Sequence, residues 1–366
     1  MNPLIIADKN YLAPFLNIRD GEVKMGQKIS LLATTYPDEL SANLNKLKQN
    51  GVRFVLLGIP EDIGPRANLG KGGADKGWQA FLARFCSLQH NKFLNGAEIT
   101  LLGHINCEDL QHDSTHLDTS NTDELAVLRT LVEQLDERVY SVCKIIFSMG
   151  LFPIVIGGGH NNAYPIIKAA SSCYNSSIAA VNFDPHSDFR NQEGRHSGNG
   201  FNYAASQGYL SHYFSLGLHE YKNSEENLNS LITAKFPWIS YQQIWSRREI
   251  SFEMALKSAE NYLINSKLPI GVELDLDCIS YVPASAYTNC GVTIQDAEYY
   301  VYSMASLPTS CYLHLAEGAP SQHSSGLQAG MSDVGQTYSA LVANFIQAKQ
   351  VSNGCVKWLL KLESIS

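Results

Sequence analysis

Three short segments of the chain concentrate the residue types that bind metal ions. They read GGGH at 157–160, DPHSD at 184–188 and DLD at 275–277. A single aspartate or histidine in such a place is more often a turn, capping or surface residue than a ligand. Carboxylates and imidazoles that recur in three separate segments indicate a metal site instead. A ligand set without cysteine favours Mn²⁺ or a similar hard ion over structural zinc.

The spacing inside these segments suits convergence on more than one ion. Asp184, His186 and Asp188 alternate along the chain, so an extended strand end would point all three the same way. Asp275 and Asp277 repeat this spacing. Five or more ligands exceed what one catalytic ion with open positions needs, and they suit two ions. The aspartates would also repel one another strongly if no cations held them together.

Apolar runs and helical periods predict the elements that position these segments. Strands are expected at 53–58, 98–102, 153–156, 178–183, 213–217, 269–276 and 311–316. Helices are expected at 74–86, 122–150, 161–171, 252–264, 295–306 and 332–348, and loops at 59–73 and 112–122. Apolar strands that alternate with amphipathic helices indicate an α/β fold, with a mainly parallel central sheet in three α/β/α layers. Ligands bind beyond the carboxyl ends of such strands, which is where all three segments fall.

The bulk composition excludes several classes of protein. The chain has 366 residues and 45% hydrophobic residues, enough to build a sizeable core. A net charge of -8 without a block of Lys and Arg argues against nucleic acid and anionic membranes as partners. No apolar stretch reaches the roughly 20 residues of a membrane helix, and we expect no signal peptide. Because the eight cysteines form no CxxC pair, we expect reduced thiols and a cytoplasmic protein.

The chain is expected to divide into an N-terminal extension and one large domain. Residues 1–50 carry little pattern beyond a helix at 37–49. The alternation of strands and helices runs over residues 51–366 without a Pro/Gly-rich linker or a shift in composition. This second stretch is therefore expected to form a single catalytic domain.

Taken together, the three segments resemble the metal motifs of the arginase, agmatinase and formimidoylglutamase family, the ureohydrolases. The resemblance covers the chain from roughly residue 50 to the end, with the motifs in the family order. It implies an arginase-like fold, two Mn²⁺ or other divalent ions, and a homo-oligomer. It also implies the ligands: His160, Asp184, Asp188 and Asp275 for one ion, and Asp184, His186, Asp275 and Asp277 for the other.

The resemblance implies a hydrolytic mechanism for a small amidine or guanidine substrate. Two divalent ions that share a water lower its pKa, so that hydroxide can attack a planar carbon near neutral pH. Asp188 would orient this nucleophile. Glu317 resembles the family's substrate-facing glutamate, which pairs with a cationic nitrogen through charge-assisted hydrogen bonds. Without the family context, a solvated charge at a strand end is an equally good interpretation of Glu317.

Two positions depart from the arginases. Ser280 stands where many members of the family carry a further acid, which is not a metal ligand. Phe201 stands where arginases have a histidine that shuttles protons, which puts arginine hydrolysis in doubt. His196 and His219 are candidates for a replacement shuttle, although a structural role is the more common one for such residues.

Other stretches resemble the formimidoylglutamases more closely. These are DFR at 188–190, HSGNGF at 196–201, GIPEDIG at 58–64 and RAN at 66–68. N-formimidoylglutamate carries two carboxylates, and arginine binds a carboxylate through two hydrogen bonds. Arg190 and Arg195 are therefore candidate substrate-binding residues, with Ser197 and Asn199 as neutral donors. Surface ion pairs are the alternative for both arginines.

The sequence thus predicts hydrolysis of N-formimidoyl-L-glutamate to L-glutamate and formamide, a step of histidine breakdown. The first alternative is another ureohydrolase, such as a guanidinobutyrase, agmatinase or arginase. The second is a non-catalytic member of the family with an interaction or regulatory role. The third is a deacetylase-like hydrolase with a single zinc, against which the additional ligands His160 and Asp277 argue.

Overall fold

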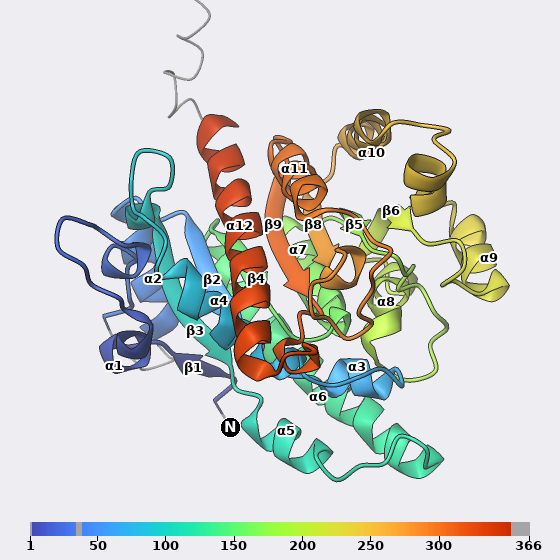
Figure 1. The fold of residues 1–366 in the computed structure, drawn as a ribbon, viewed down its shortest axis with the longest axis horizontal. Coiled ribbons are helices and arrows are strands. Elements are labelled where there is room, and N and C mark those ends of the chain that lie inside the picture. Colours follow the sequence, from blue (N-terminus) through green and yellow to red (C-terminus); the bar gives the residue numbers. More distant parts are fainter. Residues whose placement is uncertain (1, 34–38, 353–366) are drawn as a thin grey trace, which may run out of the picture.

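The computed structural model describes residues 2–33 and 39–352, which contain a nine-stranded sheet with helices on both faces (Figure 1). The strands are β1 (Leu4–Ile6), β2 (Phe54–Gly58), β3 (Ile99–Ile105), β4 (Phe152–Ile156), β5 (Ile178–Phe183), β6 (Leu210–Leu218), β7 (Trp238–Ser240), β8 (Ile270–Asp275) and β9 (Ser310–Ala316). The helices are α1 (Lys9–Leu12), α2 (Leu40–Gln49), α3 (Ile63–Ala67), α4 (Gly77–Phe85), α5 (Glu108–Ser114), α6 (Thr122–Ser148), α7 (Ala163–Tyr174), α8 (Gly200–Ser206), α9 (Glu225–Ala234), α10 (Phe252–Ser266), α11 (Ile294–Ala305) and α12 (Leu327–Ser352). The three-layer α/β/α architecture expected from the sequence is confirmed.

The sheet is parallel except at one edge. Its strands lie in the order β1-β3-β2-β4-β9-β8-β5-β6-β7, and the antiparallel pair is β1 with β3. Strands β2, β5 and β9 are buried along their whole length, because helices cover both faces, and this explains their unbroken apolar sequences. Strands β4, β9, β8 and β5 are consecutive neighbours, so their carboxyl ends meet at one edge of the sheet.

Alternate residues of each strand enter two separate hydrophobic cores. In β2, Phe54 and Leu56 belong to the core that includes residues of α4, α10, α11 and α12. Val55 and Leu57 belong to the core that includes residues of α2, α6 and α7. This alternation follows from the pleat, which sends successive side chains to opposite faces. Helix α6 begins where the capping pattern predicts it, since Asn121 accepts hydrogen bonds from the first turn.

The N-terminal residues add to one edge of this sheet. Strand β1 pairs with β3, and α1 follows it directly. Tyr11 of α1 joins two other elements: its hydroxyl accepts a hydrogen bond from Trp78 Nε1 at 2.7 Å and lies 2.8 Å from His104 Nδ1. The helix expected at 37–49 begins at Leu40, and its first two predicted residues lie outside the described residues.

Short elements account for the errors in the secondary structure prediction. The segments expected to be loops contain α3 and the end of α5, and β1, β7, α8 and α9 were not expected. Each has ten residues or fewer, too few for a hydrophobic period to stand out. The predicted long helices and central strands are all present, with ends that differ by a few residues.

None of the helices in residues 2–33 and 39–352 has the length and hydropathy needed to span a membrane. The seven cysteines in the described part of the chain are free thiols, and Cys86, Cys107, Cys143, Cys278 and Cys311 are buried. The eighth, Cys355, lies outside the described residues.

Candidate metal centre

The sheet brings together the three metal-type segments that the sequence singles out. His160 follows β4, Asp184 follows β5, and Asp275 is the last residue of β8. Glu317 follows β9, which lies between β4 and β8. Residues that are up to 157 positions apart along the chain therefore meet at the carboxyl ends of neighbouring strands.

Local turns, rather than an extended strand, aim the carboxylates. Asp184 Oδ1 accepts the backbone N–H of His186 at 2.7 Å, and Asp275 Oδ1 accepts that of Asp277 at 2.7 Å. Asp188 has a φ of 44°, in the left-handed region that favours glycine. The expectation that alternation along an extended strand end orients these side chains is wrong, because β5 ends at Phe183 and the chain turns immediately afterwards.

The first group of four side chains consists of His160 and three aspartates around it. Its Nδ1 lies 2.9 Å from Asp188 Oδ2, 3.2 Å from Asp184 Oδ2 and 3.6 Å from Asp275 Oδ2. The ligand atoms of these four residues lie within 4.8 Å of one another, and all four residues are buried. These are the same four residues that the family resemblance assigns to one ion.

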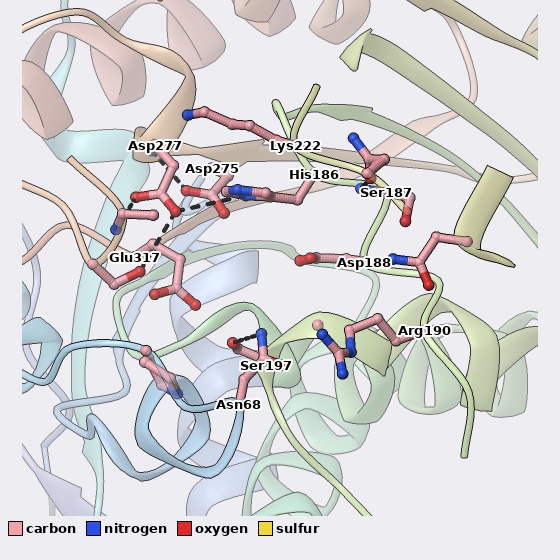
Figure 2. Close-up of a pocket in the computed structure, with 17 residues that line it drawn as sticks. Asn68, His186, Ser187, Asp188, Arg190, Ser197, Lys222, Asp275, Asp277 and Glu317 are labelled. Carbon is pink, nitrogen blue, oxygen red and sulfur yellow. Dashed lines mark hydrogen bonds and ion pairs between the residues drawn. The ribbon is translucent and has the colours of Figure 1, made fainter. Parts of the chain in front are cut away.

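A second group adjoins the first on the open side of the site. It contains His186, Asp275 and Asp277, whose ligand atoms also lie within 4.8 Å of one another. His186 Nδ1 is 3.4 Å from Asp184 Oδ1 and 3.8 Å from Asp277 Oδ2. Figure 2 shows His186 lying beside Asp275 and Asp277 at one wall of the pocket. The four residues predicted for the second ion are thus neighbours, with Asp184 and Asp275 shared between the two groups.

The donor set fits cations. Burial and the neighbouring Asp277 and Asp184 raise the pKa of Asp275 well above its usual value, and burial and Asp184 raise that of Asp188 to about 6. Neither ring nitrogen of His160 has a hydrogen-bond partner among the described residues. Buried carboxylates that repel one another around an unsatisfied imidazole are what a site for divalent ions requires.

A buried carboxylate that the sequence analysis missed lies behind His160. Glu273 is fully buried in β8, with its Oε2 3.4 Å from His160 Nε2 and 2.6 Å from His314 Nδ1. Its Oε1 accepts a hydrogen bond from the hydroxyl of Tyr312 at 2.6 Å. The signal in the sequence was a lone acid inside an apolar strand, since such a residue is rarely buried without a partner.

Glu317 faces the pocket from the end of β9. Its Oε1 accepts the backbone N–H of His160 at 2.8 Å, while Oε2 has no partner in the described part of the chain. Burial and the nearby Asp277 raise the pKa of Glu317 to about 8. Its backbone has a φ of 65°, a strained conformation that turns the carboxylate toward the acidic cluster.

One pocket joins this cluster to a set of polar side chains. Of the predicted substrate-binding residues, Arg190 and Ser197 line it, together with Asp188, Asp275, Asp277 and Glu317 (Figure 2). Residues that were not predicted also line it, among them Asn68, Lys222, Asn223 and Asn227. The pocket therefore has an acidic end and a polar end.

The structure places Arg195 and Asn199 away from the pocket, which corrects their predicted placement. Arg195 is 2% exposed, and its Nε donates to Asp136 Oδ2 at 2.8 Å. Its guanidinium lies 4.8 Å from the ring centroids of both Tyr164 and Tyr203. Its Nη1 donates to Asn199 Oδ1 at 2.6 Å. Both side chains are therefore occupied in holding the loop that follows the second metal segment.

The two alternative histidine shuttles do not line the pocket either. His196 is buried, and its Nε2 lies 3.2 Å from Glu193 Oε1. His219 Nε2 lies 2.9 Å from Gln242 Nε2, and its ring stacks on Tyr241. A structural role explains the contacts of both.

The two positions that depart from the arginases also have structural explanations. Phe201 is fully buried, stacks on Tyr213 at 4.5 Å and meets the His160 ring edge-on at 5.3 Å. Ser280 Oγ accepts the backbone N–H of Gly291 at 2.8 Å. This hydrogen bond connects the two ends of the loop that follows the third metal segment. A side chain at Gly291 would collide with the backbone of Cys278, which explains the glycine.

Comparisons with known proteins agree with this geometry. A model of the arginase family matches residues 52–346. Formimidoylglutamase of Streptococcus pyogenes serotype M3 is 26% identical over 254 residues, which cover 66% of this chain and 70% of that protein. Formimidoylglutamase of Bacillus subtilis has a TM-score of 0.68 at 16% identity, over 94% of this chain and 98% of that one. Trypanosoma cruzi formiminoglutamase, solved with Mn²⁺, has a TM-score of 0.65 at 17% identity, over 89% and 98%.

The solved structures share the fold, and the family model spans the strands that carry all three metal-type segments. The match covers most of the chain, from just before β2 into α12. The chain belongs to the arginase family.

Proposed function

We propose that this protein is a two-manganese hydrolase that cleaves the formimidoyl C–N bond of N-formimidoyl-L-glutamate. The reaction consumes one water and yields L-glutamate and formamide. The relatives named formimidoylglutamase support this substrate. The observation that carries the proposal is the pocket itself, which joins the acidic cluster and Glu317 at one end to the guanidinium of Arg190 at the other.

The six clustered side chains are the proposed metal ligands. One ion is assigned to His160, Asp184, Asp188 and Asp275, and the other to Asp184, His186, Asp275 and Asp277. Divalent ions held by these residues would lower the pKa of water at the site, so that hydroxide would be available near neutral pH. Asp188 is also assigned to orient the attacking oxygen, because it lines the pocket as well as contacting His160.

Glu317 is assigned to hold the cationic amidine. The hydrogen bond from His160 N to its Oε1 fixes the carboxylate, and its Oε2 remains available to accept an N–H of the substrate. A hydrogen bond between charged groups contributes about 1.5–3 kcal/mol. The planar carbon of the amidine is thereby held next to the acidic cluster.

Arg190 is assigned to one carboxylate of the substrate. Its side chain is 46% exposed at the pocket and its Nη2 donates to Glu193 Oε1 at 2.9 Å. This ion pair is half-exposed and contributes little stability, so the guanidinium can exchange it for a substrate carboxylate at small cost. Ser197, whose Oγ accepts a hydrogen bond from Asn68, is the neighbouring neutral donor.

A direct substrate comparison tests the proposal. Purified protein loaded with Mn²⁺ is incubated with N-formimidoyl-L-glutamate, L-arginine, agmatine or 4-guanidinobutyrate. We expect formamide and L-glutamate from the first and little urea from the others. Substantial urea without formamide would indicate a different ureohydrolase, and the absence of any turnover would indicate a non-catalytic member of the family.

We further propose that the enzyme is cytoplasmic and homo-oligomeric, with residues 51–366 as its catalytic domain. The mildly acidic composition and the free thiols of the described residues are consistent with this setting. Light scattering coupled to size-exclusion chromatography tests the oligomeric state. A single species with the mass of one chain would reject the proposed homo-oligomer.

A further inference from the structure

Two flexible cationic side chains line the pocket, and the proposed function uses only Arg190. The other is Lys222, which is exposed and lies on the loop between β6 and α9. Figure 2 shows Lys222 extending over His186 with its amine end on the side of Asp277, while Arg190 lies across the pocket beside Ser197. The two positive charges therefore approach the pocket from opposite walls.

The loop that carries Lys222 is fixed to the metal-type segment. Asn223 Nδ2 donates to the carbonyl groups of Pro185 at 2.9 Å and His219 at 3.0 Å. Asn223 Oδ1 accepts the backbone N–H of Ser187 at 2.9 Å. These three hydrogen bonds hold the backbone at Lys222 at a set position relative to residues 184–188, while the side chain itself is exposed.

A count of the charged groups that line the pocket favours a role for Lys222. Two divalent ions offset the four aspartates, and the amidinium of the substrate offsets Glu317. The two carboxylates of N-formimidoyl-L-glutamate then need two positive charges, of which Arg190 supplies one. Lys222 lines the pocket and forms no ion pair with another described residue, so we assign the second positive charge to it.

Building on the proposed function, we propose that Lys222 is a specificity-determining residue that binds the second carboxylate of the dicarboxylate substrate. Asn227, which lines the same wall, is the adjacent neutral donor. A lysine here also repels the primary ammonium group that arginine and agmatine carry at the corresponding end. The same side chain thus favours an anionic tail and disfavours a cationic one.

The test compares Lys222→Met with wild type, both loaded with Mn²⁺. Binding of L-glutamate, the proposed product, is measured by calorimetry beside 4-aminobutyrate and 2-aminobutyrate, which each lack one carboxylate. Formamide release is measured from the N-formimidoyl derivatives of all three. Loss of a charge-assisted contact is expected to raise the Kd of L-glutamate and the KM of its derivative by about 10–100-fold. The monocarboxylate that lacks the carboxylate bound by Lys222 should have the same Kd for the variant and for wild type.

Two further variants show whether a loss of L-glutamate affinity is specific to the positive charge at position 222. Lys222→Arg should recover most of the affinity, and Lys46→Met removes an exposed lysine of α2 far from the pocket and should change nothing. Manganese content is measured for each variant, because the positive charge of Lys222 acts on Asp277. If wild type releases formamide and Lys222→Met binds L-glutamate equally well, this assignment fails and the proposed function stands. If wild type releases no formamide, the proposed function fails and the assignment fails with it.

Discussion

Two carboxylates flank the imidazole of His160, one at each ring nitrogen. Asp188 lies 2.9 Å from its Nδ1, and Glu273 lies 3.4 Å from its Nε2. The negative charge of Glu273 next to Nε2 favours the tautomer in which Nε2 carries the proton and Nδ1 carries the lone pair for a metal ion. His314 and Tyr312 hold Glu273 in place from the far side.

This arrangement predicts the effect of Glu273→Gln. The amide keeps the size of the side chain but not its charge, so His160 becomes a weaker ligand. We expect Mn²⁺ affinity to fall by about 10–100-fold, as measured by calorimetric titration of metal-free protein. The control is Glu133→Gln, at an exposed position of α6. Equal affinities for the two variants would contradict the role of Glu273.

Glu317 supports a second prediction at the residue scale. A glutamine at this position can still accept the backbone N–H of His160 but has no charge for the amidinium. We expect Glu317→Gln to lower kcat by about 10²–10³-fold while it retains two metal ions per chain. Steady-state formamide release and metal analysis on the same sample check this. A kcat close to that of wild type would mean that another group holds the amidine.

The six clustered residues could be singled out from the sequence because acids and histidines recur at three strand ends. Glu273 and Lys222 carried no such signal, since one charged residue in a strand or a loop has many ordinary explanations. Arg195 was misplaced because the sequence does not reveal that Asp136, 59 positions earlier, reaches its guanidinium. Contacts between distant segments of this kind depend on the fold, not on local pattern.

At the scale of elements, the strand order gathers the candidate site. Strands β4, β9, β8 and β5 are adjacent, and each contributes residues at its carboxyl end. Long periodic helices and buried central strands were predictable because packing against both faces leaves a strong hydrophobic pattern. Elements such as β1 and β7, with three residues each, depend on neighbours that the sequence does not show.

Helix α1 and strand β3 are joined by a hydrogen-bonded chain that makes stability depend on pH. The Trp78 N–H donates to the Tyr11 oxygen, and the Tyr11 hydroxyl shares a second hydrogen bond with His104 Nδ1. Burial lowers the pKa of His104 to about 4, so its imidazole is neutral in the folded protein near pH 7. Between pH 4 and 6.5 the unfolded chain binds more protons than the folded one, so stability is lost as the pH falls through this range.

The variant His104→Gln tests this chain, because glutamine can accept from Tyr11 but does not titrate. Between pH 7 and pH 4.5, wild type should lose roughly 1–3 kcal/mol more stability than the variant. Urea unfolding at the two pH values gives both free energies, and contributions from the acidic cluster cancel in the comparison. Identical pH dependence would show that His104 is not held neutral by the fold.

At the scale of the whole molecule, an acidic chain concentrates negative charge at one edge of its sheet. The fold class was predictable because the alternation of strands and helices runs through most of the sequence. The role of the first 50 residues could not be predicted, because β1 and α1 are short and join the sheet through contacts with β3 and α4. The family model begins at residue 52, so β1 and α1 lie outside the part of the chain that it matches, while their partners β3 and α4 lie inside it.

The central claim is that this edge of the sheet holds two metal ions. Metal-free protein is loaded with excess Mn²⁺, freed of unbound metal by gel filtration, and analysed for manganese by mass spectrometry and for protein by amino acid analysis. Two manganese ions per chain are expected for wild type, and Asp275→Ala, which removes a ligand of both groups, should retain none. A wild-type content of one ion or none would contradict the two-metal site and the hydrolysis proposed for it.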